Sequence, residues 1–175
     1  MNISIQRFTK SNAAQLSAIS KKTFYDTFTG TCTEEDMQWF LEKYFNEEGF
    51  FKELDNDNFF CYAAIINNEV AGFIKFKESS TDFTISTNLK SIELKSLYVD
   101  VPYHGKGVAQ VLMNCLLQHV SDFNYQLIYL SVWEYNFKAQ AFYKKFGFEP
   151  SGFTNDFPIG NTPQTDFWYW KKILN

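Results

Sequence analysis

The chain has few of the residues that build metal centres or disulfide frameworks. Its 175 residues include three cysteines and two histidines. Cys32, Cys61 and Cys115 lie far apart in the sequence, and no pair of them has the spacing of a metal site. We therefore expect no metal, and we expect reduced cysteines in a cytoplasmic protein.

Long apolar runs and an excess of positive charge are also missing. No apolar run approaches the roughly 18 residues of a membrane span, and the first residues lack the basic-then-apolar pattern of a signal peptide. The formal net charge is −4. This charge argues against nucleic acid as a partner and mildly favours a cationic one. We expect neither a membrane nor a nucleic-acid partner.

Apolar and aromatic residues, in contrast, are plentiful. Hydrophobic residues make up 45% of the chain and aromatic residues 19%, with 20 phenylalanines. A chain of this length and composition can bury a sizeable core. No repeat, linker or low-complexity tract divides the sequence, so we expect one domain over residues 1–175.

Hydrophobic periodicity predicts a mixed α/β (α+β) fold. Alternating apolar residues predict strands at 2–8, 59–66, 70–77, 89–99, 127–133, 148–153 and 164–173. Helical spacing predicts helices at 11–28, 47–54, 106–123 and 136–146, and another that Thr33 caps. Ser11 is the expected N-cap of the first helix, Asn67 and Asn68 form a turn, and residues 79–88 form a loop. Side chains expected to face inward from the second and third helices are Met37, Phe40, Leu41, Tyr44, Phe50, Phe51 and Leu54.

A glycine-rich connection stands between the strand at 89–99 and the helix at 106–123. Pro102 disfavours helical geometry at Val101, and Gly105 and Gly107 follow. Glycines allow the backbone to approach a phosphate, and the first turn of a helix has N–H groups without internal partners. The sequence therefore favours an anion site, although a glycine-rich connection without a ligand has the same pattern. A dinucleotide fold fits less well, because its fingerprint requires three glycines and a later acidic residue.

Two motifs resemble those of the GNAT superfamily of acyl-CoA-dependent N-acetyltransferases. His104-Gly105-Lys106-Gly107-Val108-Ala109, after Leu97-Tyr98-Val99, is similar to the family's motif A. His104 departs from it, because the family usually has Arg or Gln there. The segment from Leu130 to Phe148, with Asn136, the Phe142-Tyr143 pair and Gly147, resembles motif B. Shorter stretches at 23–28, 33–37 and 164–166 resemble the bacterial spermidine/spermine N-acetyltransferases.

The resemblance implies a fold and a cofactor site. The fold is a GNAT-like, mixed, twisted and mostly antiparallel sheet with two splayed central parallel strands and helices on both faces. Acetyl-CoA enters between the splayed strands, and we expect a β-bulge near Leu97 and Tyr98. The resemblance implies that coenzyme A contacts Leu97, Tyr98, Val99, His104, Gly105, Lys106, Gly107, Val108, Ala109, Gln110, Asn136, Tyr143 and Lys145.

The resemblance also implies catalytic roles for two residues. Glu93 is the candidate general base, and a solvated strand carboxylate is its alternative. Tyr143 is the candidate acid that protonates the leaving thiolate, with core packing as its alternative. Asn136 can also cap the helix that follows it, and Lys106 can simply be solvated. None of the three cysteines lies in either motif, so we expect direct attack without a covalent enzyme intermediate.

Acceptor contacts are the least specified part of the sequence. Phe24, Tyr25 and Phe28 are the candidate substrate-binding residues, although they can equally be core aromatics. We expect a primary amine, most readily a polyamine, as acceptor. Alternatives are a protein or peptide amine, an antibiotic amine, or a domain that senses acyl-CoA without turnover. Aromatic residues alternate along 167–170, and one aromatic face of that strand can serve as a homodimer contact.

Overall fold

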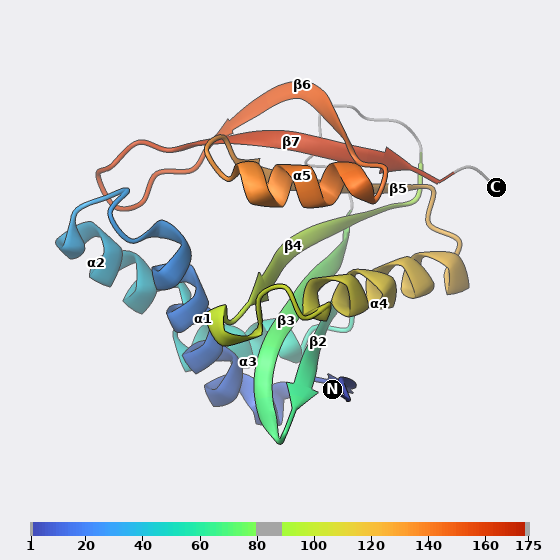
Figure 1. The fold of residues 1–175 in the computed structure, drawn as a ribbon, viewed down its shortest axis with the longest axis horizontal. Coiled ribbons are helices and arrows are strands. Elements are labelled where there is room, and N and C mark those ends of the chain that lie inside the picture. The colour runs from blue at the N-terminus through green and yellow to red at the C-terminus, as the bar shows by residue number, and fades with distance from the viewer. Residues whose placement is uncertain (1, 80–88, 174–175) are drawn as a thin grey trace.

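The structure of the chain is a computed structural model that describes residues 2–79 and 89–173 (Figure 1). The described strands form one seven-stranded sheet in the order β1-β2-β3-β4-β5-β7-β6. The strands are β1 (Ser4–Arg7), β2 (Phe59–Ile66), β3 (Glu69–Ser79), β4 (Ser91–Val99), β5 (Leu127–Trp133), β6 (Glu149–Asp156) and β7 (Thr165–Lys172). Neighbouring strands are antiparallel except β4 and β5, which are parallel. The expected mixed sheet is confirmed.

Helices cover both faces of this sheet. They are α1 (Ala13–Phe28), α2 (Glu34–Tyr44), α3 (Glu47–Leu54), α4 (Val108–Asp122) and α5 (Phe137–Lys145), with short 3-10 turns at Lys10–Asn12 and Val101–Tyr103. Residues of α4 and α5 pack with Ile74, Phe76 and Ile128 in the largest hydrophobic cluster. Residues of α1 and α3 pack on the other face against Cys61 and Phe73. Figure 1 shows β4 diverging from β5 and β7, and we call the region between these diverging strands the opening.

Local signals placed most elements correctly. Thr33 caps α2, because its side chain accepts a hydrogen bond from the Asp36 N–H at 3.1 Å. Asn67 and Asn68 have φ values of 51° and 66°, so both adopt the left-handed conformation of a tight hairpin turn. Of the loop expected at 79–88, residues 80–88 lie outside the described part of the chain, and Ser79 is the last residue of β3.

The expected N-cap of the first helix was wrong. The N-cap of α1 is Asn12 rather than Ser11, and a 3-10 turn with Thr9 as its own N-cap leads into the helix. The Thr9 N–H donates to Asn12 Oδ1 at 3.0 Å, so the turn and not Ser11 organises the start of the helix.

Two expected core positions were also wrong. Tyr44 is 50% exposed and Phe51 is 46% exposed. Phe45 occupies the inward place instead, with its ring 5.1 Å from Phe24 and 6.0 Å from Phe50. Phe45, just after the end of α2, therefore takes the inward position expected for Tyr44. In α3, Phe50 is the only fully buried residue.

Candidate functional site

The two central strands run parallel for a short distance and then part. Ser91–Glu93 pair with Leu127–Tyr129, and no further pairs join β4 to β5 within the described residues. Beyond Glu93, the edge of β4 that faces β5 therefore has no strand partner, and Leu97 and Val99 lie on this stretch. An extended ligand can bind there as an added strand would.

The expected β-bulge lies two residues earlier than predicted. Ser96 is opposite Lys75 and Leu94 is opposite Phe76, so Lys95 is the extra residue of β4. The prediction of a bulge near Leu97 and Tyr98 was therefore wrong in position. A bulge bends its strand and increases the local twist, and this one begins where the parallel pairing ends. The sequence predicted that β4 has a bulge but not its exact residue, because the alternation of one strand does not show which of its residues lacks a partner.

The glycine connection forms an open backbone cradle at the start of α4. Gly105 and Gly107 have φ values of 73° and 83°, and a Cβ built on either would meet no atom within 4 Å outside its chain neighbours. Gly107 is the N-cap of α4, and no side chain caps the helix start. The first N–H groups of α4 are thus available to an anion. Val108 is buried in the core and fixes the cradle to the sheet.

Close packing beneath the cradle requires another glycine. A Cβ built on Gly72 of β3 would lie 2.6 Å from the Tyr98 carbonyl oxygen and 3.2 Å from Val108 Cγ1. Glycine therefore allows β3, β4 and the start of α4 to approach one another. Sequence reasoning did not single out this position, and a glycine within a strand was the available signal.

His104 uses its side chain within the protein. Its Nε2 lies 2.8 Å from the Val99 carbonyl oxygen, and its Nδ1 lies 3.1 Å from Lys138 Nζ on α5. The imidazole thus joins the end of β4 to the first turn of α5 across the opening. Lys106 of the same loop is exposed.

Three further predicted cofactor residues lie at the ends of α4 and α5. Asn136 is the N-cap of α5, and its Oδ1 accepts a hydrogen bond from the Ala139 N–H at 3.0 Å. The capping role is therefore present. Lys145 is exposed in the last turn of the same helix, and Gln110 is exposed in the first turn of α4.

Tyr143 lies inside the main core. It is 7% exposed and its ring is 5.8 Å from that of Phe148. Burial raises the pKa of its hydroxyl. Burial also raises the pKa of the Tyr98 hydroxyl, and negative charge on Tyr143 or Asp166 raises it further. The Tyr98 hydroxyl on β4 is therefore influenced by groups on α5 and β7.

Glu93 is buried and doubly paired. Its Oε1 lies 2.9 Å from Lys95 Nζ and its Oε2 lies 3.5 Å from Lys77 Nζ. The bulged Lys95 therefore turns its ammonium group back to the carboxylate. The solvated-carboxylate alternative does not describe this residue, because its side chain is 11% exposed.

Two of the three predicted acceptor residues are core aromatics. Phe24 and Phe28 are 2% and 5% exposed, and their rings stack at 4.4 Å. Phe28 also packs 5.3 Å from Trp133 at the end of β5. Tyr25 is half-buried, and its hydroxyl donates to Glu34 at 3.2 Å. With Trp133 they form a hydrophobic cluster on the α1–α2 side of the sheet, which we term the acceptor face because the predicted acceptor residues lie there.

Sequence reasoning assigned no role to Asp166, although it is a prominent polar group of the acceptor face. Asp166 is 6% exposed and lies opposite Trp133 in the β5–β7 register. Burial raises its pKa to about 6, and a hydrogen bond with the Ser131 side chain partly offsets this shift. Its Oδ1 and the Trp133 indole N–H are buried and have no hydrogen-bond partner among the described residues. An acid amid the aromatic residues of a strand was the signal that could have found it.

A carboxylate of α2 ties down the connection between β6 and β7. The Asn161 N–H donates to Asp36 Oδ1 at 2.9 Å, and the Thr162 hydroxyl donates to Oδ2 at 2.8 Å. A Cβ built on Gly160 would lie 2.1 Å from the same carboxylate. This Asp36 clamp holds the segment that leads to Asp166 against α2.

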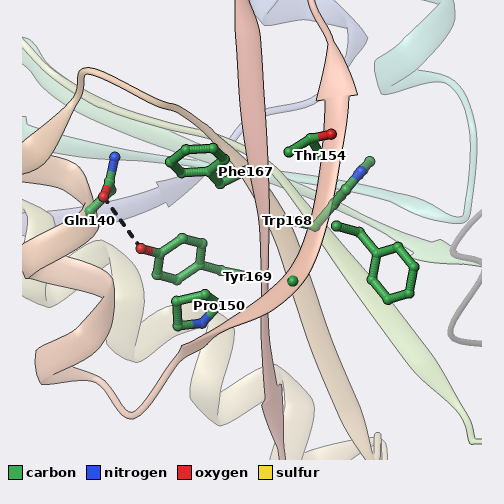
Figure 2. A pocket seen from close by; sticks show the side chains of 8 residues that line it. Gln140, Pro150, Thr154, Phe167, Trp168 and Tyr169 are labelled. Atoms are coloured by element: carbon green, nitrogen blue, oxygen red, sulfur yellow. Dashed lines mark hydrogen bonds between the residues drawn. The ribbon is translucent and has the colours of Figure 1, made fainter.

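A surface cavity of about 290 Å³ opens between β6 and β7 (Figure 2). Three β6 residues bulge out between Pro150 and Thr154. Beside the cavity, the Tyr169 hydroxyl donates a hydrogen bond to Gln140 Oε1 at 3.4 Å. Among the described residues that line it, none is a predicted cofactor, catalytic or acceptor residue. Tyr169 is buried and its aromatic neighbours in β7 are partly buried, so the homodimer contact stays a prediction.

Two kinds of feature are missing from the described part of the chain. Residues 2–79 and 89–173 contain no group of three or more His, Cys, Asp or Glu side chains that could hold a metal ion. None of the helices there combines the length and the apolarity that crossing a bilayer requires.

Several N-acetyltransferases are similar to this chain in sequence or in fold. An uncharacterized N-acetyltransferase of Lactobacillus delbrueckii subsp. lactis is 28% identical over 173 residues, which are 98% of each chain. The spermine/spermidine N(1)-acetyltransferase of Bacillus subtilis strain 168 is 26% identical over 87% of this chain and 91% of its own. The PaiA N-acetyltransferase of Thermoplasma acidophilum, solved with coenzyme A, has a TM-score of 0.78 and 21% identity, covering 99% and 100% of the two chains.

The family model for the acetyltransferase (GNAT) family matches residues 21–148. This range contains both splayed strands, the glycine cradle and the helix that carries Tyr143. The match spans most of the chain, and the parted strands and uncapped helix start are the features that the motifs predicted. The chain therefore belongs to the acetyltransferase (GNAT) family, and it is an acyltransferase.

Proposed function

We propose that this protein transfers the acetyl group of acetyl-CoA to a primary amine of a small cationic acceptor of the polyamine type. The supporting observation is that β4 parts from β5 after Glu93, and that its unpaired stretch leads through the glycine connection to the uncapped start of α4. The net charge of −4 suits a cationic acceptor. The Bacillus subtilis relative, named for spermine and spermidine, favours the polyamine class.

The residues of the opening fit acetyl-CoA. The N–H groups at Gly107, Val108, Ala109 and Gln110 would hold the diphosphate, with Lys106 and Lys145 supplying positive charge. The open edge of β4 at Leu97 and Val99 would pair with the pantetheine amides. Asn136 would add a side-chain contact beyond its capping bond. When bound, acetyl-CoA supplies an activated thioester.

The chain's own groups would then move protons and stabilise charge. A primary ammonium has a pKa of about 10.4, so at neutral pH it must lose a proton before its nitrogen can attack the thioester carbon. Glu93 would take that proton. Backbone N–H groups of β4 would stabilise the developing negative charge on the acyl oxygen. Tyr143, whose raised pKa keeps it protonated, would give its proton to the sulfur as the C–S bond breaks. The second proton lost by the new amide nitrogen would return Tyr143 to its protonated form.

The lysines beside Glu93 define how this base would work. Both carboxylate oxygens are engaged, so a proton reaches Glu93 through water or after one ammonium shifts. Glu93→Gln should lower kcat/KM and flatten its pH dependence. An unchanged pH profile would remove Glu93 from the mechanism.

Thiol release in the presence of an amine panel tests the function. The panel holds spermidine, spermine, a peptide with a free N-terminus, lysine and an aminoglycoside, and calorimetry measures acetyl-CoA binding alongside. Polyamine-dependent release supports the proposal. Release with only the peptide or the antibiotic would replace the acceptor class. Tight acetyl-CoA binding without release for any amine would indicate an acyl-CoA sensor.

A further inference from the structure

We infer that Asp166 binds a second ammonium group of the acceptor, one that is not acetylated, and so selects linear di- and polyamines over monoamines. The inference rests on the proposed function, because it takes the vicinity of Glu93 as the place where the reacting amine loses its proton. Asp166 would be a binding residue that determines specificity.

The first argument is the missing counter-charge. Asp166 is 6% exposed, and its Oδ1 has no hydrogen-bond partner among the described residues. No ion pair in residues 2–79 and 89–173 involves it. Buried carboxylates are normally paired, because removing a charge from water costs several kcal/mol. An acceptor ammonium would supply the partner that the chain itself does not provide.

The second argument is the aromatic surroundings. Trp133, opposite Asp166 in the register, belongs to the cluster that also holds Phe28 and Tyr98. The Trp133 ring lies 5.3 Å from Phe28 and 5.4 Å from Tyr135. Aromatic faces attract cations, and most strongly where water is excluded. A carboxylate beside such rings matches an ammonium better than a neutral group.

The third argument is position along the sheet. Glu93 lies opposite Tyr129, and Asp166 lies opposite Trp133, four residues further along β5. Opposite residues share a face of the sheet, as do positions 129 and 133. Four strand residues span about 13 Å, which is of the order of an extended polyamine. A lasting ion pair would keep the reacting nitrogen protonated and inert, so Asp166 serves a nitrogen that keeps its charge.

Tyr98 is a titratable group that interacts with Asp166. Negative charge on Asp166 raises the pKa of Tyr98 on β4, and negative charge on Tyr143 of α5 acts on Tyr98 in the same direction. Both tyrosines are therefore neutral at physiological pH. Asp166, with a pKa of about 6, is then the group that changes charge near neutrality.

The test compares a diamine with a monoamine of equal length in which a hydroxyl replaces the far amino group. In Asp166→Asn, KM for the diamine should rise about 30-fold, while KM for the monoamine should change less than about twofold. Asp166→Glu should restore part of the preference for the diamine. Asp156→Asn is the matched control, because Asp156 is an exposed acid of the adjacent strand β6. It should behave as the wild type.

Each outcome decides the inference. Equal loss for both amines, or no loss for either, overturns it, since a merely structural role would not depend on the charge of the acceptor. If the wild type acetylates no amine, the proposed function fails by itself. Calorimetry of spermidine with the CoA-saturated protein then judges Asp166 separately. Weaker spermidine binding in Asp166→Asn than in the wild type supports Asp166 as the ammonium-binding residue. Equal binding by the two proteins overturns the inference, and so does a wild type that binds no spermidine.

Discussion

The cradle at the start of α4 and the acceptor face lie on opposite parts of one opening, and they are built in different ways. The cradle consists of consecutive residues, Gly105 to Gln110, and it presents backbone N–H groups. The acceptor face combines side chains of α1, β5 and β7 that are distant in sequence. A site made of backbone N–H groups is damaged by changes of backbone conformation more than by side-chain replacement. A site made of side chains is damaged directly when one of those side chains is replaced.

The largest expected effect is on kcat in Tyr143→Phe, with no change in acetyl-CoA affinity. Tyr143→Phe removes only a buried hydroxyl, and loss of a positioned acid should lower kcat by about 100- to 1000-fold. Acetyl-CoA affinity should stay the same in calorimetry, because the cradle is untouched. Tyr169→Phe is the control, since it removes a hydroxyl that contacts Gln140 in the same core. Full activity of Tyr143→Phe would leave core packing as the role of this residue.

Stability should reveal the cost of the buried acid. The pKa of Asp166 is about 6 in the folded chain, against about 3.9 unfolded. The folded state therefore binds the proton more tightly, and wild-type stability falls as pH rises from about 4 to 6. Asp166→Asn should raise the free energy of unfolding at pH 8 by about 3 kcal/mol, and the gain should vanish near pH 4. Denaturant titrations at both pH values measure it, and a gain that does not vary with pH would contradict the assignment.

A change of backbone conformation should damage the cradle. Gly107→Val places a β-branched residue at a φ of 83°, where the left-handed conformation costs about 1–2 kcal/mol. We expect acetyl-CoA affinity to fall about tenfold as the helix start shifts. Gly152→Val carries the same strain at a φ of 86° but lies on β6, so it should lose stability without losing affinity. Equal affinity losses in both variants would trace the effect to general destabilisation.

The smallest expected effect concerns a side chain in the cradle. His104→Ala removes the contacts with Val99 and Lys138 but leaves the N–H groups of α4 in place. We expect acetyl-CoA affinity to change less than about threefold in calorimetry, because the anion is held by backbone groups. A loss as large as that of Gly107→Val would show that the imidazole itself holds the ligand.

The same difference explains what could be predicted from the sequence. The cradle and the caps at Thr33 and Asn136 follow from local glycine spacing and capping residues, and alternation locates the strands. The parted parallel strands were predicted only through the resemblance to the GNAT motifs. The bulge at Lys95 was misplaced because an unpaired residue depends on the partner strand. The ion pairs of Glu93 and the role of Asp166 depend on register across three or more strands, which periodicity along one chain does not contain.

The Asp36 clamp has a consequence for exchanging parts between relatives. The carboxylate of α2 accepts two hydrogen bonds from the β6–β7 connection and leaves no room for a side chain at Gly160. A chimera that takes only one of these two segments from a relative would leave the Asp36 carboxylate without its hydrogen-bond donors, or would bring a side chain at position 160 into collision with it. Grafting a foreign specificity onto this scaffold thus requires transplanting the helix start and the distant turn as a matched set.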